Sequence, residues 1–143
     1  VARTLARCPG KLPQNEQEKA LDNALASAAV QVAMERHAGS LEILQLPFGE
    51  ARIQRGKNLM EFKTVIGTGG PVINNSCPAA VLAKACFNPT RPWSLKPRCP
   101  RLFLDSRYSL YAVGLLADLH PDVALRVGWR YLKELQENGE TAS

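Results

Sequence analysis

The first extended pattern along the chain is that of a helix with an apolar stripe. It begins after Asn15, a typical N-cap residue, and ends before Gly39. The stripe consists of Leu21, Leu25, Ala28 and Val32, with Ala24, Ala29 and Ala33 nearby. Because alanine side chains are small, we expect this helix to approach a neighbouring element closely.

The middle of the chain has the patterns of β-strands. Residues 41–46 and 51–54 flank Pro47, Phe48 and Gly49, which predicts a β-hairpin. Residues 62–66 end in apolar β-branched side chains, as a buried parallel strand does, and residues 102–104 predict a second short strand.

Helical patterns follow both short strands. Pro78 opens a helix that reaches about Phe87, and Asp105 with Ser106 caps a helix that reaches Ala117. A last helix is predicted from a four-residue repeat of Val123, Val127, Tyr131 and Leu135. Alternating strands and helices predict an α/β layer with right-handed crossovers.

The composition is that of one globular domain. Of 143 residues, 45% are hydrophobic and 22% are charged. We expect an irregular lead-in over residues 1–13, a domain over 14–136 and a flexible tail over 137–143. Neither a membrane-spanning run nor a secretory signal is visible, so we expect a cytoplasmic protein with no membrane partner.

The net charge of +5 raises the question of a nucleic-acid partner. One cluster of cations, threaded through prolines, consists of Arg91, Lys96, Arg98 and Arg101. A solvated loop is favoured over a nucleic-acid patch by about three to one. A small basic module that binds nucleic acid or protein is therefore the second hypothesis for function.

The four cysteines lack the paired spacing of a zinc site. They are Cys8, Cys77, Cys86 and Cys99, and we expect all four to be free thiols. Cys77 precedes a helix, which gives a third hypothesis, a thiol enzyme.

The most informative local feature is the turn Gly67-Thr68-Gly69-Gly70-Pro71, which follows the strand at 62–66. Glycines at the carboxyl end of a buried strand remove the Cβ atoms that would keep a ligand away from the backbone. The spacing matches neither the dinucleotide fingerprint nor a P-loop. From the residues alone, a tight turn and a ligand-binding loop are about equally favoured.

Asp105 and His37 are weaker candidates for a site. Asp105 ends a strand and opens a helix, where a cap is favoured over an active-site carboxylate by about two to one. His37 lies at a helix end, where a hydrogen-bonded histidine is favoured over a metal or acid–base role. Because the sequence contains no Ser/His/Asp arrangement and no convincing carboxylate pair, we assign no catalytic residue and no metal ligand.

Several blocks of the sequence resemble the glutamate mutase (methylaspartate mutase) accessory protein family. They are residues 28–39, 54–59, 65–73, 104–108, 112–117 and 120–125, in family order over nearly the whole chain. The resemblance implies an actin-like ATPase (ribonuclease H-like) half-domain with a β-hairpin, short parallel strands and packed helices. It also implies a chaperone-like accessory factor that reactivates a coenzyme-B12-dependent mutase such as glutamate mutase.

In that superfamily a strand that ends in a glycine pair, matched here by Gly69 and Gly70, packs against adenosine. The resemblance therefore gives the turn the role of binding ATP or ADP, with Mg in the full-length protein, and places Asp105 and His37 behind it. The nucleotide-binding residues are Gly67, Thr68, Gly69, Gly70 and Pro71. The superfamily's two phosphate loops find no match, so we expect a C-terminal part that binds nucleotide weakly and is not catalytic alone. Whether it forms a homo-oligomer to cover an open sheet edge is left open.

Overall fold

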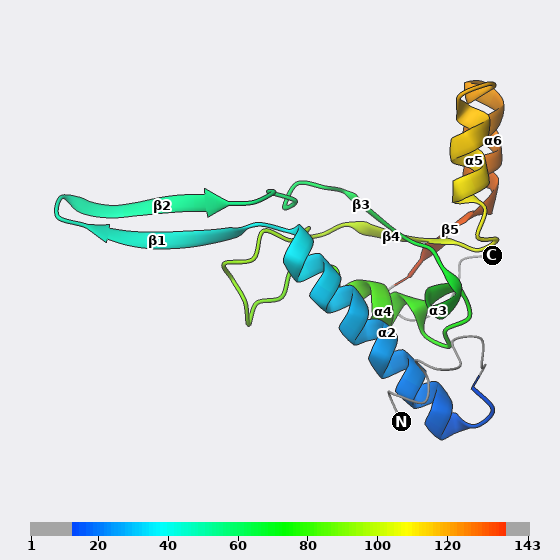
Figure 1. Ribbon diagram of the computed structural model, residues 1–143, viewed down its shortest axis with the longest axis horizontal. Helices are drawn as coiled ribbons and strands as arrows, with labels where there is room; N and C mark the ends of the chain where they lie inside the picture. Colours follow the sequence, from blue (N-terminus) through cyan, green and yellow to red (C-terminus); the bar gives the residue numbers. More distant parts are fainter. Residues whose placement is uncertain (1–12, 137–143) are drawn as a thin grey trace.

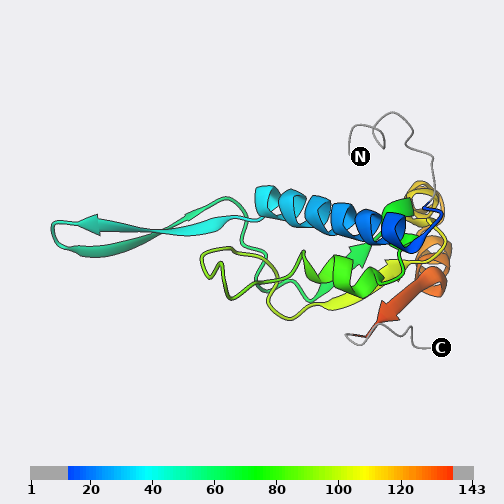
Figure 2. The same cartoon turned by 90° about the horizontal axis from the view of Figure 1, so that it is seen from below.

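The computed structural model describes residues 13–136 as an elongated body with an arm at one end and a helical hairpin at the other (Figures 1 and 2). The elements in chain order are α2 (Glu16–His37), β1 (Ser40–Leu46), β2 (Gly49–Arg55), β3 (Thr64–Gly67), α3 (Gly70–Ile73), α4 (Pro78–Ala83), β4 (Arg101–Asp105), α5 (Leu110–Ala117), α6 (Pro121–Tyr131) and β5 (Leu132–Leu135). The α/β class is confirmed. Of the predicted lead-in, residues 1–12 lie outside the described residues, as does the whole predicted tail.

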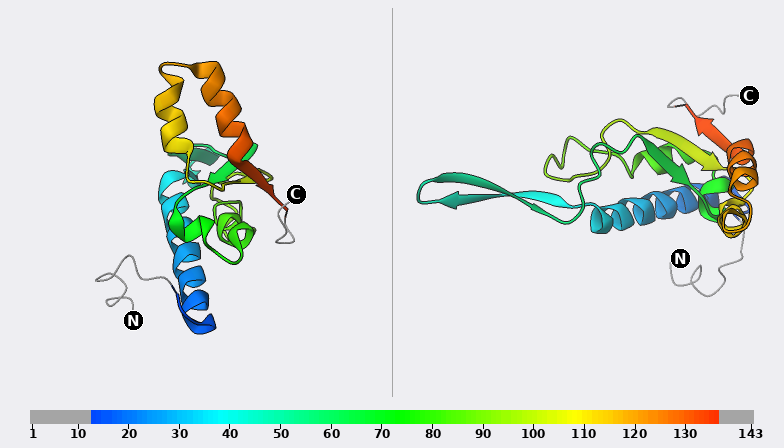
Figure 3. Two further views of the ribbon diagram at one scale, coloured as in Figure 1. Left: turned by 90° about the vertical axis from the view of Figure 1, so that its right-hand side faces the viewer. Right: turned by 90° about the horizontal axis from the view of Figure 1, so that it is seen from above.

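Three short strands form the sheet of the body, in the order β3-β4-β5. β3 runs parallel to β4, with Gly67 opposite Leu104, and β5 runs antiparallel to β4. α3 and α4 connect the two parallel strands and pack with α2 on one side of the sheet. α5 and α6 project on the other side, beyond the end of β4 (Figures 1 and 3). Both short strands predicted from the sequence are confirmed, but β3 is not buried as predicted, since Ile66 is 43% exposed.

A single apolar cluster joins this sheet to the helices beneath it. Its buried members are Ala26, Val72, Ala79, Val81, Leu82, Leu102, Leu104 and Leu135. They come from α2, α3, α4, β4 and β5, so the core is assembled from segments far apart in the sequence. Burial of such side chains contributes about 1.5–3 kcal/mol each for the larger ones. This core holds β3 and β4 in the parallel register that determines where both strands end.

α2 turns a different face to the core from the one its apolar stripe predicts. Leu25 and Val32 are 41% and 44% exposed, whereas Ala26 is buried and Val30 packs against the core. The alanines predicted at the contact, Ala24, Ala28, Ala29 and Ala33, are exposed. The predicted stripe is wrong because apolar residues surround the helix, and contacts with α3 and α4 select the buried face.

The last helix ends earlier than its pattern predicts. α6 ends at Tyr131, and Leu132 has extended backbone angles (φ −81°, ψ 117°) that lead into β5. Leu135 is buried, but as a strand residue opposite Leu102. The prediction of a helix through Leu135 is wrong because β5 pairs with the edge of β4, whose backbone groups would otherwise lack partners.

α5 and α6 form an antiparallel pair that, among residues 13–136, joins the sheet at its base (Figure 3). α6 buries Ala124 and Gly128, whereas Val123, from the predicted stripe, is 39% exposed. A Cβ atom at Gly128 would lie 3.3 Å from Val113 of α5, so the small residue permits the close approach. Within residues 13–136, none of the helices is both long enough and apolar enough to cross a membrane.

The predicted β-hairpin is confirmed and forms the arm. β1 and β2 pair along their whole length, from Ser40 opposite Arg55 to Leu46 opposite Gly49. Backbone hydrogen bonds from Gly39 to Lys57 (2.6 Å) and from Leu41 to Trp93 (2.8 Å) join its base to the body. Beyond that base the arm extends into solvent (Figure 2), and Phe48 at its tip is fully exposed.

Candidate functional site

The glycine turn and Asp105 meet at one edge of the sheet. Because β3 and β4 are parallel and Gly67 lies opposite Leu104, the residues that follow both strands are neighbours. The Thr68 hydroxyl donates a hydrogen bond to Oδ2 of Asp105 (3.1 Å). Open α/β sheets bind ligands at this carboxyl edge. The structure therefore brings together the turn and Asp105, which are 37 residues apart in sequence.

Asp105 holds the start of the helical hairpin in place. Its Oδ1 accepts hydrogen bonds from the backbone N–H (2.9 Å) and hydroxyl (3.2 Å) of Ser109, and its Oδ2 accepts one from the N–H of Leu110 (3.0 Å). Burial raises the pKa of the Asp105 carboxyl, but the hydrogen bonds from Ser109, Leu110 and Thr68 outweigh burial and hold that pKa below its ordinary value. Asp105 is 1% exposed, so its oxygens serve the protein itself. Asp105 thus binds the first N–H groups of α5, as a cap does, but the N-cap residue itself is Ser109 rather than Asp105.

The three glycines of the turn differ in what their missing side chains permit. A Cβ atom at Gly67 would lie 2.7 Å from two carbons of Leu82, so this glycine lets β3 approach α4. Gly69 has φ +97°, a backbone conformation that disfavours other residues. A Cβ atom at Gly70 would meet, among the described residues, only the side-chain nitrogen of Asn74, at 3.9 Å. Packing and backbone geometry thus account for the first two glycines but not for Gly70.

The turn leads into helices that are shorter than predicted. Gly70 and Pro71 open α3, a single turn that the sequence did not predict, and α4 ends at Ala83 rather than near Phe87. α5 begins at Leu110, five residues after Asp105. The intervening turn contains two exposed residues that sequence reasoning missed, Arg107 and Tyr108, and Tyr108 has φ +53°. A positive φ at a bulky residue is the only signal that marks this turn, and it is visible only in the structure.

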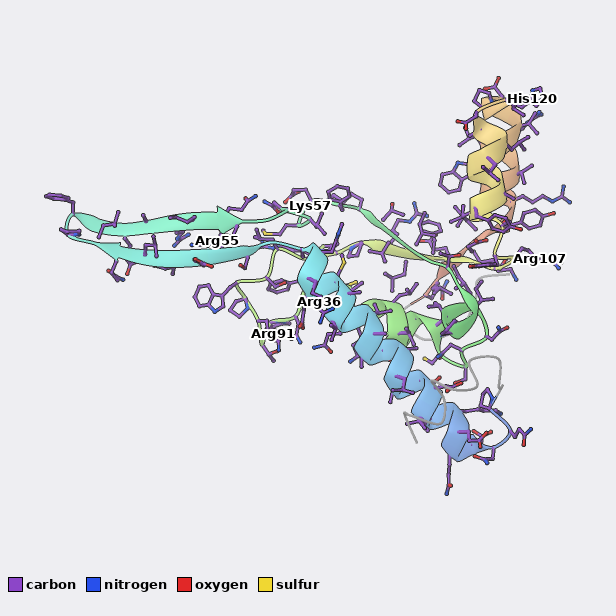
Figure 4. The ribbon with its side chains drawn as sticks, viewed as in Figure 1. Arg36, Arg55, Lys57, Arg91, Arg107 and His120 are labelled. Atoms are coloured by element: carbon purple, nitrogen blue, oxygen red, sulfur yellow. The ribbon has the colours of Figure 1, made fainter. Side chains whose placement is uncertain are left out.

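The two histidines lie away from this edge. His37 is exposed in the last turn of α2, at the end of the helix that adjoins the arm (Figure 1). The part of α2 that lies near α3 is instead around Asn23, whose side chain donates a hydrogen bond to Ser76. The expectation that His37 lies behind the glycine turn is therefore wrong, because α2 runs away from the turn along its length. His120 is an exposed residue between α5 and α6 (Figure 4).

The basic cluster does not form one surface. Lys96 is buried, and Arg91 pairs with Glu35 at 2.8 Å. Arg98 lies over the Phe87 ring at 5.7 Å, and Arg101 Nε donates to Glu134 at 2.7 Å. Since phosphate backbones need several unpaired cations on a common face, this arrangement disfavours a nucleic-acid interface.

The thiols also give little support to an enzyme. Cys77 and Cys99 are free thiols, as predicted, whereas Cys8 lies outside the described residues. Cys77 is the N-cap of α4, and its thiol makes no cap hydrogen bond. Within the part of the chain that the structure describes, no base is bonded to that thiol, so the pairing that activates a nucleophilic cysteine is not seen there.

Comparison with known proteins identifies the family. The model of the MutL protein family matches residues 1–132. Protein MutL of Clostridium tetanomorphum is 40% identical over 121 residues, which cover 85% of this chain and 26% of that protein. The chain thus spans about a quarter of the length of the curated relative it matches. No solved structure matches the chain significantly. The actin-like fold that the resemblance implies therefore has no support from a known structure. The chain belongs to the MutL protein family, the glutamate mutase accessory proteins.

Proposed function

We propose that the chain is the nucleotide-binding lobe of an accessory factor that reactivates a coenzyme-B12-dependent mutase such as glutamate mutase. Membership of the family supports the mutase as partner. The observation that supports nucleotide binding is the open space above the backbone at Gly69 and Gly70, at the carboxyl edge of two parallel strands. ATP or ADP is the ligand that the resemblance implies.

Gly70 is the residue that most favours a ligand at this turn. A residue whose side chain would meet almost nothing among the described residues has no need to be glycine for packing. Here Gly70 is the first residue of α3. A ligand that lies on the backbone supplies the missing reason, because any side chain at this position would occupy its place.

The charge around the turn decides which part of a nucleotide lies there. Asp105 keeps its negative charge close to Thr68, and this disfavours a phosphate group at the same point. A neutral base and ribose suit the glycines better. The phosphates and Mg would then lie farther out, where other parts of a longer protein hold them, and these described residues alone would bind nucleotide without hydrolysing it.

The test is a comparison of two glycine variants of the 143-residue chain. Gly70→Val should weaken ADP binding at least about tenfold in calorimetric titration, because the isopropyl group fills the space above the backbone. Gly114→Val is the matched control, since a Cβ atom at Gly114 of α5 meets no described atom within 4 Å. Equal affinities of Gly70→Val and the unchanged chain for ADP would overturn the nucleotide site.

The partner requires a separate measurement. Purified glutamate mutase should co-elute with the chain in gel filtration at concentrations of tens of micromolar, about the range of a transient complex. Independent elution at these concentrations would contradict the mutase part of the proposal and leave the nucleotide site standing.

A further inference from the structure

A second candidate site lies at the opposite end of the sheet from the glycine turn. An open cavity of about 210 Å³ is lined by the C-terminal half of α2, the end of α4 and the loop that leads into β4. Its polar lining residues include Gln31, Glu35, Lys84, Arg91, Ser94 and Lys96. We propose that this cavity binds a small anion of the carboxylate or phosphate class.

The buried ammonium group of Lys96 is the first reason to expect an anion in this cavity. Its side chain is 4% exposed, and its ammonium group donates one hydrogen bond, to the backbone oxygen of Lys84 at 3.2 Å. The nearest carboxylate oxygen, Oε1 of Glu35, is 3.9 Å away, beyond hydrogen-bonding distance. An ammonium has three donors, so this buried charge retains capacity for an acceptor in the cavity that it lines.

The Glu35 carboxylate does not satisfy the remaining hydrogen-bond donors of Lys96. Its Oε1 already accepts hydrogen bonds from Gln31 (3.0 Å) and Arg91 (2.8 Å). Hydrogen bonding by Gln31, followed by the charges of Arg91 and Lys96, holds the pKa of Glu35 below its ordinary value despite partial burial. One carboxylate therefore faces two cations at the cavity, Arg91 and Lys96, which leaves a positive excess. An anionic ligand would balance that excess.

Backbone hydrogen bonds hold the loop of Lys96 in place, in addition to the bond from its ammonium group to Lys84. The backbone of Leu95 donates to Gly39 (2.9 Å) and accepts from Leu59 (2.9 Å), and Phe87 donates to Pro97 (2.8 Å). These bonds hold the loop against the end of α2 and the turn after α4. An apolar side chain at position 96 would fill the same space without the cost of a buried ammonium. The charge therefore has a role beyond holding the loop in place.

The size of the cavity limits the ligand. Sites for drug-sized molecules measure roughly 300–1,000 Å³, so this smaller cavity suits a phosphate ion or a short carboxylic acid. Arg91 lies in the loop near the end of α2 that carries exposed Arg36 (Figure 4), so the approach to the cavity is also positive. Cations near an entrance raise the local concentration of anions.

The test uses the 143-residue chain and two probes, inorganic phosphate and succinate, each titrated to about 50 mM with sodium chloride as the ionic-strength control. Backbone amide shifts in the NMR spectrum should move at residues 86–96 and stay still at the glycine turn. Alkylation of Cys86, which lines the cavity, should slow several-fold in the presence of the bound anion, while alkylation of Cys99 should not change.

Two matched variants locate the site. Arg91→Gln, at an exposed side chain, should keep the fold and weaken the anion about tenfold through loss of a charged hydrogen bond. Arg107→Gln, at the far end of the sheet, should leave binding unchanged (Figure 4). Binding of only one probe assigns the class of anion and supports the site. No shift at residues 86–96 with either probe, or equal binding by Arg91→Gln, would overturn it.

Discussion

The substitution Asp105→Asn tests the hydrogen bonds that join the glycine turn to the start of α5. The two side chains have the same shape, but asparagine has one acceptor oxygen and one NH₂ group in place of two acceptor oxygens. Each oxygen of Asp105 accepts one backbone N–H, from Ser109 or Leu110, and one hydroxyl. The substitution therefore alters every bond at this point without changing its volume.

The size of the effect follows from these bonds. A hydroxyl can rotate and accept a bond from the new NH₂ group, but a backbone N–H cannot. One of the two N–H groups, that of Ser109 or Leu110, is left without an acceptor, at a cost of about 1–3 kcal/mol, and the surviving bonds lose their charge assistance. We expect the free energy of unfolding at pH 7 to fall by about 2–3 kcal/mol in Asp105→Asn.

Urea unfolding followed by circular dichroism measures this loss. With an m-value of about 2 kcal/mol/M, the midpoint should fall by about 1 M. Asp118→Asn, at the exposed C-cap of α5, is the matched control and should change stability by less than about 0.5 kcal/mol.

The dependence on pH gives a second criterion. Because the folded-state pKa of Asp105 lies below the unfolded value of about 3.9, its stabilising contribution is present above that value and is lost as the pH falls through the folded pKa. The difference between the unchanged chain and Asp105→Asn should therefore shrink below about pH 4. Equal stability at pH 7, or a difference that persists undiminished to about pH 2, would refute the reasoning.

Five further substitutions test the packing. Gly67→Ala should lower stability by about 1–3 kcal/mol, because its Cβ atom would press on Leu82, whereas Gly70→Ala should change it by less than about 0.5 kcal/mol in the same thermal unfolding assay. Leu135→Ala should lower the free energy of unfolding in urea by about 2–4 kcal/mol. Leu125→Ala, at a residue 62% exposed on α6, should lower it by less than about 1 kcal/mol. Similar losses in the two variants would contradict the placement of β5. Phe48→Ser should leave the unfolding midpoint nearly unchanged, since the ring is fully exposed, and a large loss would mean that the tip of the arm packs against protein.

Elements with a local signal could be predicted from the sequence. Alternation over residues 41–54 and the short turn at Pro47 and Phe48 define the hairpin, and the β-branched run before Gly67 defines β3. The capping role of Asp105 follows from its place between a strand and a helix. Each of these features depends on neighbours within a few residues, which sequence patterns record directly.

Features that depend on distant contacts needed the structure. The buried face of α2 was predicted wrongly because the helix has apolar residues all around, and only α3 and α4 determine which of them meet the core. Residues 132–135 continue a helical pattern, yet they form β5 because they pair with the edge of β4. Lys96 belongs to a charged cluster in the sequence, but the fold buries it against Lys84 and Glu35.

Local patterns of residues were enough to define the glycine turn, the strand that leads to it and the family to which the chain belongs. The bond from Thr68 to Asp105, the packing role of Gly67, the open space at Gly70 and the cavity at the other end of the sheet became visible in the folded chain. The physical reason is that hydrogen-bond partners, empty space and buried charge arise from the meeting of segments that are distant in sequence. A local pattern carries no record of those meetings.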